Sequence, residues 1–222
     1  MKGFYLAVVA VLVIGIGWLV YQARSKPGQG AGLGAEEPVP AATDGFRGYA
    51  MGNDSARIQI TEYSDFECPY CAAFATVQMP EVREQLIATG RVFWRYRDFP
   101  LSSHKWSRLA ALAAQCAGEQ GKFWDMHDQL FGHRDWVERD KDPTDVFHGF
   151  AQAIGLDLAR YDECVKSRRY AGRIQASLEE GQALHIQGTP TFFVNGRHFE
   201  GRATSDAFKA IVDSLSAARR KG

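Results

Sequence analysis

Two cysteines separated by two residues, Cys68-Pro69-Tyr70-Cys71, stand between a strand-like segment and a helical one. Residues 57–63, RIQITEY, alternate as a half-buried strand does, and proline favours the first turn of a helix. That helix is expected to end at Gly90 and to be kinked at Pro80, because proline donates no backbone hydrogen bond. The position of the cysteine pair, after a strand and at the start of a helix, constrains the fold more than the four letters alone.

The segments that follow give an α/β order. Residues 91–97, RVFWRYR, indicate a second strand, so strand, helix and strand form a βαβ unit. A helical period then runs through residues 102–184. Asn195-Gly196 between two apolar runs predicts a hairpin, and a last helix closes the chain. We therefore expect an α/β domain over residues 51–219 with a helical subdomain inserted at about 102–186.

The N-terminal segment is expected to lie outside this domain. Residues 3–21 carry no charge and are long enough, as a helix, to cross a bilayer core of roughly 30 Å. We predict an uncleaved transmembrane anchor over residues 1–24. The alternative is a cleaved signal peptide, but the apolar stretch exceeds the usual length of about 7–15 residues and no clean A-x-A site follows. Residues 25–50, rich in Gly, Pro and Ala, are expected to be a flexible linker.

The place of the cysteines predicts thiol chemistry. Free N–H groups and the helix dipole at the first turn stabilise a thiolate, so Cys68 should have a low pKa, be exposed and act as the nucleophile. Cys71, one turn later, should be shielded and resolve a mixed disulfide with a partner. The alternatives are half of a zinc site or a purely structural disulfide. Zinc needs a second ligand pair at short spacing, and Cys116 and Cys164 stand alone, so no metal or cofactor is expected.

Four segments in order resemble the DsbA-like branch of the thioredoxin superfamily. They are residues 66–71, FECPYC; 97–101, RDFPL; 116–124, CAGEQGKFW; and 188–192, GTPTF. The resemblance covers nearly everything after the linker and implies a thioredoxin-like fold. It also implies that the Thr189–Pro190 peptide bond is cis and packs against the cysteine pair, where the Thr189 backbone could pair with an extended substrate strand. Base rates alone would favour a trans bond.

Glu62 is an unusual residue for its position. It lies six residues before Cys68, on the strand face that Ile58 and Ile60 make apolar. The resemblance implies a buried acid behind the cysteine pair that accepts or relays the proton of Cys71. Burial would raise its pKa, as that role needs. The alternative is a carboxylate that reaches solvent at the end of the strand.

Cys116 and Cys164 raise a second question. An even number of cysteines in an exported protein favours pairing, so we expect a structural disulfide between two helices. The alternative is two buried free thiols acting as small apolar side chains. His104 could cap a helix or pack as easily as act, and no function is assigned to it.

The leading hypothesis is an extracytoplasmic thiol-disulfide oxidoreductase, anchored to the membrane, that oxidises exported proteins. The resemblance implies a membrane partner that re-oxidises it, similar to DsbB or to vitamin K epoxide reductase. The alternatives are a reductase or isomerase, for example in cytochrome maturation, or, in another class, an anchored module in which Cys68 and Cys71 bind Cu(I). A formal net charge of zero gives no support for a nucleic-acid partner.

Overall fold

The computed structural model describes residues 32–36 and 45–218 of the chain. In that part, six strands form one sheet in the order β1-β6-β5-β3-β4-β2. They are β1 (Gly32–Glu36), β2 (Tyr49–Met51), β3 (Ile58–Ser64), β4 (Val92–Asp98), β5 (Thr191–Val194) and β6 (Arg197–Glu200). Strands β3 and β4 are parallel, as a βαβ unit requires, and the other neighbouring pairs are antiparallel.

One helical run follows the cysteine pair. It consists of α2 (Pro69–Ala73), the π-helical turn η1 (Phe74–Gln78), α3 (Met79–Val82) and the π-helical turn η2 (Arg83–Ile87). A kink was expected at Pro80. The structure instead widens the helix on both sides of α3, and the Met79 N–H bonds the Phe74 carbonyl five residues back. The run stops before Gly90, whose φ of +71° is easily adopted only without a side chain.

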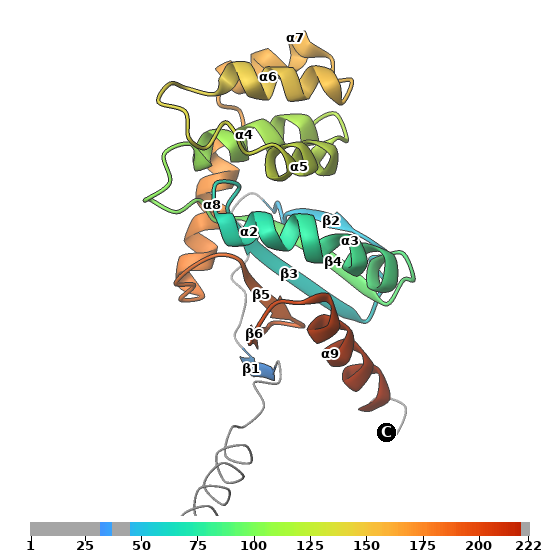
Figure 1. Cartoon of the computed structure of the whole chain (residues 1–222). Helices are drawn as coiled ribbons and strands as arrows, with labels where there is room; N and C mark the ends of the chain where they lie inside the picture. The colour runs from blue at the N-terminus through green and yellow to red at the C-terminus, as the bar shows by residue number, and fades with distance from the viewer. Residues whose placement is uncertain (1–31, 37–44, 219–222) are drawn as a thin grey trace, which may run out of the picture.

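The expected helical subdomain lies between β4 and β5. Its helices are α4 (Ser107–Gly118), α5 (Phe123–Gly132), α6 (Thr144–Ala153), α7 (Leu158–Lys166) and α8 (Ala171–Ala183). Figure 1 shows α4 to α7 stacked at one end of the described chain, beyond α2, with α8 returning toward the sheet. The expected α/β architecture with a helical insertion is confirmed.

Three clusters of buried side chains hold these layers together. On one face of the sheet, Trp94 packs with Phe74 of η1 and Phe208 of the last helix, α9 (Ser205–Ala218). On the other face, Tyr63 and Leu178 belong to a smaller cluster beneath α8. The third cluster joins α2 to the helical subdomain and includes both cysteines of the CPYC segment. The cysteine pair therefore lies at the junction of the sheet, its first helix and the insertion.

The span expected to be a linker, residues 25–50, contains strand β1 and the first two residues of β2. Strand β1 pairs with β6 and strand β2 with β4. The Tyr49 ring stacks on Phe123 with 3.9 Å between centroids, so side-chain packing begins before the expected domain boundary at residue 51.

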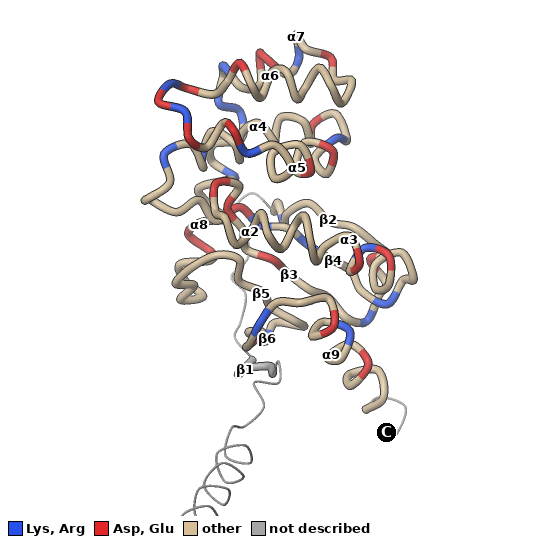
Figure 2. The backbone as a smooth tube through the Cα atoms, in the orientation of Figure 1, with Lys and Arg blue, Asp and Glu red and all other residues tan. Residues whose placement is uncertain are grey.

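The predicted anchor over residues 1–24 lies outside the described residues. Within the described ranges, no helix combines the length and the apolar character needed to cross a bilayer. Figure 2 shows acidic and basic residues interspersed along the described elements.

Candidate active site

Cys68 and Cys71 lie where β3 gives way to α2. Cys68 is the residue before the helix, and Pro69 is the first helical residue. The turn is closed by the Cys68 N–H, which donates to the Asp65 carbonyl at 3.1 Å. Both cysteines are free thiols one helical turn apart. The segment thus presents a dithiol at a helix N-terminus.

The two thiols have opposite acidities. A hydrogen bond from the Cys71 thiol, helped by the backbone N–H groups of Tyr70 and Cys71, lowers the pKa of Cys68 to about 5. Burial raises the pKa of Cys71 well above its usual value, and the neighbouring Cys68 raises it further. Near neutral pH the pair is therefore a Cys68 thiolate that accepts a hydrogen bond from a Cys71 thiol.

The expected exposure of Cys68 is wrong. Only 3% of Cys68 is exposed, although it stands at the helix start. The loop before β5 lies over its sulfur, with the Cys68 Sγ 3.3 Å from the Thr189 carbonyl oxygen, a contact that a thiol makes as the donor. The two residues between the cysteines face solvent, since Pro69 is exposed and Tyr70 is 75% exposed.

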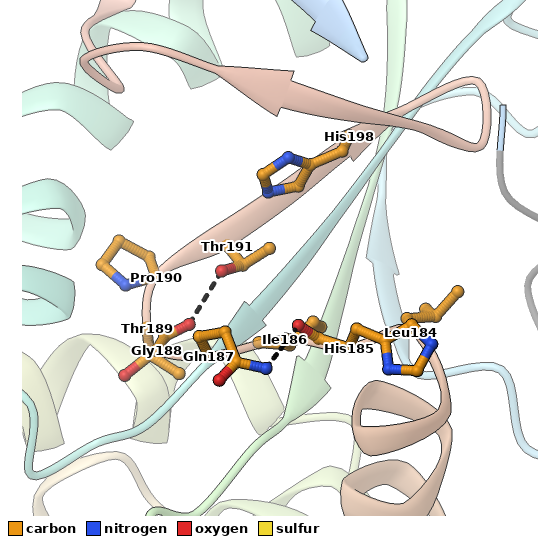
Figure 3. A pocket seen from close by; sticks show the side chains of 9 residues that line it. All are labelled: Leu184, His185, Ile186, Gln187, Gly188, Thr189, Pro190, Thr191 and His198. Carbon is orange, nitrogen blue, oxygen red and sulfur yellow. Dashed lines mark hydrogen bonds between the residues drawn. The ribbon is translucent and has the colours of Figure 1, made fainter. Parts of the chain in front are cut away.

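That loop carries a cis peptide bond between Thr189 and Pro190. Within it, the Thr191 hydroxyl donates to the Gly188 carbonyl at 2.7 Å, as Figure 3 shows. A pocket of about 380 Å³ opens beside the loop and is lined by residues 184–191 and His198. The structure therefore brings Thr189 and Pro190 to the cysteine pair and places an open concavity next to them.

Glu62 is fully buried on β3. The indole N–H of Trp94 donates to its Oε2 at 3.1 Å, and burial raises the pKa of Glu62 to about 7. The Ser64 hydroxyl lies near both the Glu62 carboxyl and the Cys71 thiol and lowers the pKa of each. The carboxyl does not reach solvent, so the alternative of a solvated strand-end acid does not hold.

Asp65 and Glu67, the two acids on either side of Phe66, fix the turn before Cys68 through hydrogen bonds. The sequence analysis did not predict a role for either. Asp65 accepts hydrogen bonds from the Glu67 N–H and from His104 Nδ1, each at 2.8 Å. The Glu67 carboxylate accepts from the Trp106 N–H at 2.7 Å, while Arg134 donates to the Phe66 and Glu67 carbonyls. His104 thus acts on the turn through Asp65. The sequence signal was the pair of acids just before the first cysteine.

This geometry can be compared with known proteins. The thioredoxin family model matches residues 46–214. This chain belongs to the thioredoxin family. Among solved structures, BdbD from Bacillus subtilis is 25% identical with a TM-score of 0.67, covering 74% of this chain and 90% of its own. A thioredoxin-like oxidoreductase from Silicibacter pomeroyi is 27% identical with a TM-score of 0.61, covering 78% and 92%.

Two further comparisons define the relationship. Wolbachia pipientis α-DsbA1, 21% identical, shares the fold with a TM-score of 0.68 over 76% of this chain and 90% of its own. A protein named Na(+)/H(+) antiporter NhaA 3, from Salinispora tropica, is 38% identical over 96% of this chain but only 33% of its own length. The chain thus spans about a third of the curated relatives it matches, and the antiporter name belongs to them. Within the thioredoxin family, this chain shares its fold with BdbD, with α-DsbA1 and with the thioredoxin-like oxidoreductase of Silicibacter pomeroyi.

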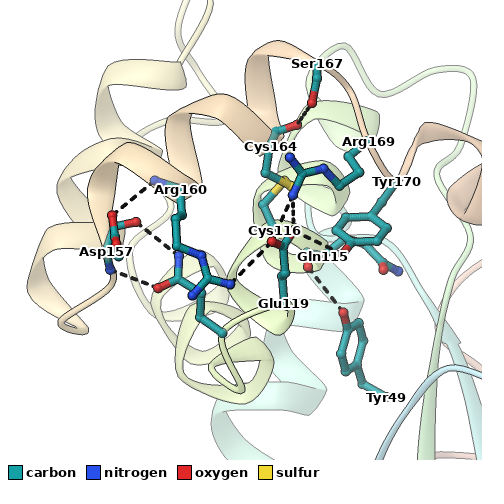
Figure 4. The surroundings of a disulfide bond; sticks show 11 residues. Tyr49, Gln115, Cys116, Glu119, Asp157, Arg160, Cys164, Ser167, Arg169 and Tyr170 are labelled. Carbon is teal, nitrogen blue, oxygen red and sulfur yellow. Dashed lines mark hydrogen bonds and ion pairs between the residues drawn. A yellow bond between two sulfur atoms is a disulfide. The ribbon is translucent and has the colours of Figure 1, made fainter.

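The other two cysteines of this thioredoxin-family chain are bonded to each other. A disulfide joins Cys116 of α4 to Cys164 of α7, with 5.8 Å between the Cα atoms. Figure 4 shows it beside Glu119, which pairs with Arg169 at 2.7 Å. The bond links two helices of the insertion, and both cysteines are 1% exposed. The described residues hold no group of three or more His, Cys, Asp or Glu side chains that could bind a metal ion.

The alkylation rate of Cys68 in the reduced chain is expected to rise with a midpoint near pH 5, because the thiolate is the reacting form. The alkylation rate of a free cysteine has its midpoint at about pH 8.5. The measurement is the iodoacetamide rate between about pH 3 and pH 9, with Cys68 followed by peptide mass spectrometry.

The same chain unfolded in urea is the control, and its Cys68 should titrate like a free cysteine. Because the folded pKa is lower than the unfolded one, ionised Cys68 stabilises the reduced fold fully above about pH 8.5, and that contribution is lost as the pH falls through 5. A folded-state midpoint near pH 8 would contradict the assigned acidity.

Proposed function

We propose that this chain is an oxidase that introduces disulfides into exported proteins. The observation that carries the proposal is the free Cys68 thiol at the start of α2, where the Cys71 thiol and the first-turn N–H groups lower its pKa. A stabilised thiolate favours the reduced pair over its disulfide, which makes the oxidised pair a strong disulfide donor.

The exchange runs in two steps. A substrate thiolate attacks Cys68 Sγ of the oxidised pair, forms a mixed disulfide and displaces Cys71, which takes up a proton. A second substrate thiolate then attacks the substrate sulfur of the mixed disulfide. The substrate leaves with a new disulfide, and Cys68 leaves as the stable thiolate. In the reverse sense, Cys71 loses its proton and resolves a mixed disulfide at Cys68.

Three neighbouring residues support these steps. The loop of Thr189 and Pro190 lies against the pair and beside the pocket of Figure 3, which suits it to hold an extended substrate segment. The proposed role of Glu62 is to exchange the proton of Cys71, since a carboxyl whose pKa is about 7 can both give and take a proton near neutral pH. The disulfide of Cys116 and Cys164 is proposed to be structural.

Re-oxidation of the pair requires an external oxidant. We propose a membrane redox partner similar to DsbB or to vitamin K epoxide reductase, which accepts the two electrons of the dithiol. The apolar segment at residues 3–21 supports an anchor that places the catalytic domain on the extracytoplasmic side. Substrates would then be exported proteins that carry cysteines.

A redox titration tests the direction of exchange. The full chain is equilibrated across glutathione buffers, and the oxidised fraction of Cys68–Cys71 is quantified by alkylation and peptide mass spectrometry. For an oxidase, the pair should be half oxidised near the potential of about −120 mV that is typical of strong disulfide donors.

The Cys116–Cys164 peptides serve as an internal control, because a structural disulfide should stay oxidised in the same buffers. A midpoint near −270 mV, the thioredoxin end of the scale, would show a reductase instead.

A further inference from the structure

Four polar side chains form a buried band behind the cysteine pair. Because strand side chains alternate, Glu62 and Ser64 share one face of β3, while Tyr96 and Asp98 share the same face of β4. The parallel register sets Glu62 beside Tyr96 and Ser64 beside Asp98. None of the four is more than 3% exposed. The preceding residues on this face are apolar, so the band marks the strand ends next to α2.

Several atoms of this band lack a hydrogen-bond partner among the described residues. They are Glu62 Oε1, the Ser64 hydroxyl, the Tyr96 hydroxyl and Asp98 Oδ1, and Gln115 Oε1 of the neighbouring α4 also lacks one. A buried polar atom without a hydrogen bond costs about 1–3 kcal/mol of folding free energy. About 90% or more of buried polar atoms in proteins have a hydrogen-bond partner. Tyrosine offers a donor and carboxylates offer acceptors, so these atoms are suited to a hydrogen-bonded chain that internal water completes.

Tyr96 is electrostatically coupled both to the cysteine pair and to Asp98. Its pKa is raised first by burial and then by the charges of Asp98, Glu62 and Cys71, so its hydroxyl lies within electrostatic reach of all three. Tyr96 and Cys71 also belong to the same buried cluster. The Ser64 hydroxyl lies beside the Cys71 thiol at the start of the band.

From Asp98 the polar contacts continue toward the surface. Gln115 donates to Asp98 Oδ2 at 2.7 Å, and the Tyr49 hydroxyl donates to the Gln115 carbonyl at 3.2 Å, the second contact being visible in Figure 4. The charges of Asp98 and Glu119 both act on the Tyr49 hydroxyl. Glu119, with a side chain 21% exposed, lies at the outer end of this route. A Cβ on Gly118 would come 2.1 Å from the Tyr49 oxygen, so glycine is what lets Tyr49 approach α4.

We propose that Asp98 is a second buried proton acceptor of this active site, exchanging the proton of Cys71 through the Tyr96 hydroxyl, in parallel with Glu62. The inference rests on the proposed roles of Cys68 and Cys71, but not on whether the chain is an oxidase or a reductase.

The proton balance is the same in both directions. When the Cys68–Cys71 disulfide is attacked at Cys68, the bond between the two Sγ atoms breaks and the Cys71 thiolate takes a proton from Asp98 through Tyr96. When Cys71 attacks a mixed disulfide at Cys68, the new Sγ–Sγ bond forms, the partner leaves as a thiolate, and the Cys71 proton passes to Asp98. Tyr96 gives up one proton as it receives another, so it ends unchanged.

The acidity of Asp98 suits this role. Burial raises its pKa to about 6, against the opposing hydrogen bond from Gln115, while the pKa of Glu62 is about 7. Both carboxyls therefore change protonation near the pH at which a proton carrier works best. The charged or titratable groups coupled electrostatically to Asp98 are Arg97, Asp65, Tyr96 and Tyr49, and those coupled to Glu62 are Arg83 and Tyr96.

The test follows the proton step directly. The full chain is converted in acid to the mixed disulfide of Cys68 with glutathione, the pH is raised to values between about 5 and 9, and the release of glutathione by Cys71 is timed. Glu62→Gln and Asp98→Asn should each slow release by less than about tenfold, because the other route remains. In the double variant the rate of glutathione release should fall by about a hundredfold or more, which is within the usual contribution of general acid-base catalysis. Its rate should also no longer change with pH near neutrality, because both titrating carboxyls have been removed.

Tyr96→Phe removes one hydroxyl and should slow release as Asp98→Asn does, with no further loss when the two are combined. The matched control is Tyr161→Phe, which removes another buried hydroxyl without a described partner, on α7, and should leave release unchanged. Unchanged release and pH profile for Tyr96→Phe in the Glu62→Gln background would overturn the inference, even if Asp98→Asn did not fold. If the unmodified chain released no glutathione, the proposed roles of the cysteines would fail as well.

Discussion

Replacing Cys68 with serine is expected to abolish thiol-disulfide exchange, reducing the rate to that of the uncatalysed reaction. A serine hydroxyl forms no disulfide, and no other described thiol is free at the helix N-terminus except Cys71, which burial holds protonated. The measurement is oxidation of a dithiol peptide by the oxidised full chain, compared with the same amount of the serine variant.

Cys71→Ser is the matched variant and should behave differently. It keeps the nucleophile but cannot resolve a mixed disulfide, so covalent adducts at Cys68 should accumulate and be seen by mass spectrometry. Cys71→Ala, which unlike serine leaves no hydrogen-bond donor at this position, should raise the pKa of Cys68, because the hydrogen bond from the Cys71 thiol contributes most to lowering it. Full exchange activity in Cys68→Ser would contradict the site.

Replacing Glu180 with glutamine is expected to lower the free energy of unfolding by about 3–5 kcal/mol, the usual cost of leaving a buried charge unpaired. Glu180 of α8 accepts from both Arg97 and Tyr63, and Arg97 is only 2% exposed. The second Arg97 contact, to the Phe46 carbonyl at 2.6 Å, does not neutralise its charge. Urea denaturation of the oxidised and reduced chain measures the effect.

A surface ion pair provides the control for that experiment. Arg139 and Asp145 lie 3.1 Å apart with side chains 35% and 67% exposed. Asp145→Ala should change the unfolding free energy by no more than about 1 kcal/mol, as is typical of solvated pairs. A Glu180→Gln effect of similar size would mean that the Arg97 charge is solvated after all.

Local sequence rules predicted the elements that carry the site. The alternation in residues 57–63 matches β3, and Pro69 opens α2 as the motif indicated. Asn195 and Gly196 have φ values of 50° and 78°, the left-handed conformations that a two-residue hairpin turn between β5 and β6 requires. These features depend on residues close together in the chain, which is why the sequence alone sufficed.

Other features followed from the resemblance or were not predicted. Local statistics favour a trans Thr189–Pro190 bond, the resemblance implied cis, and the structure has cis. Strands β1 and β2 were not expected, since their sequences have no strand signal and they exist by pairing with β6 and β4. The disulfide of Cys116 and Cys164 was one of two alternatives until the positions of α4 and α7 were known.

The sequence by itself determined where the reactive pair lies, because strand, turn and helix around Cys68 are set by neighbouring residues. The sequence also predicted the low pKa of Cys68 from its place at the helix start, and only the tertiary structure decided how the pair is buried and which distant groups act on it. Cys68 is buried beneath the Thr189 loop, and His104 forms a hydrogen bond with Asp65. The charge of Asp98 acts on the Tyr96 hydroxyl on the same face of β4. The first two contacts join parts of the chain that are distant in sequence. Desolvation and charges a few ångströms away also set a pKa, and only the fold brings together groups that are far apart in the sequence.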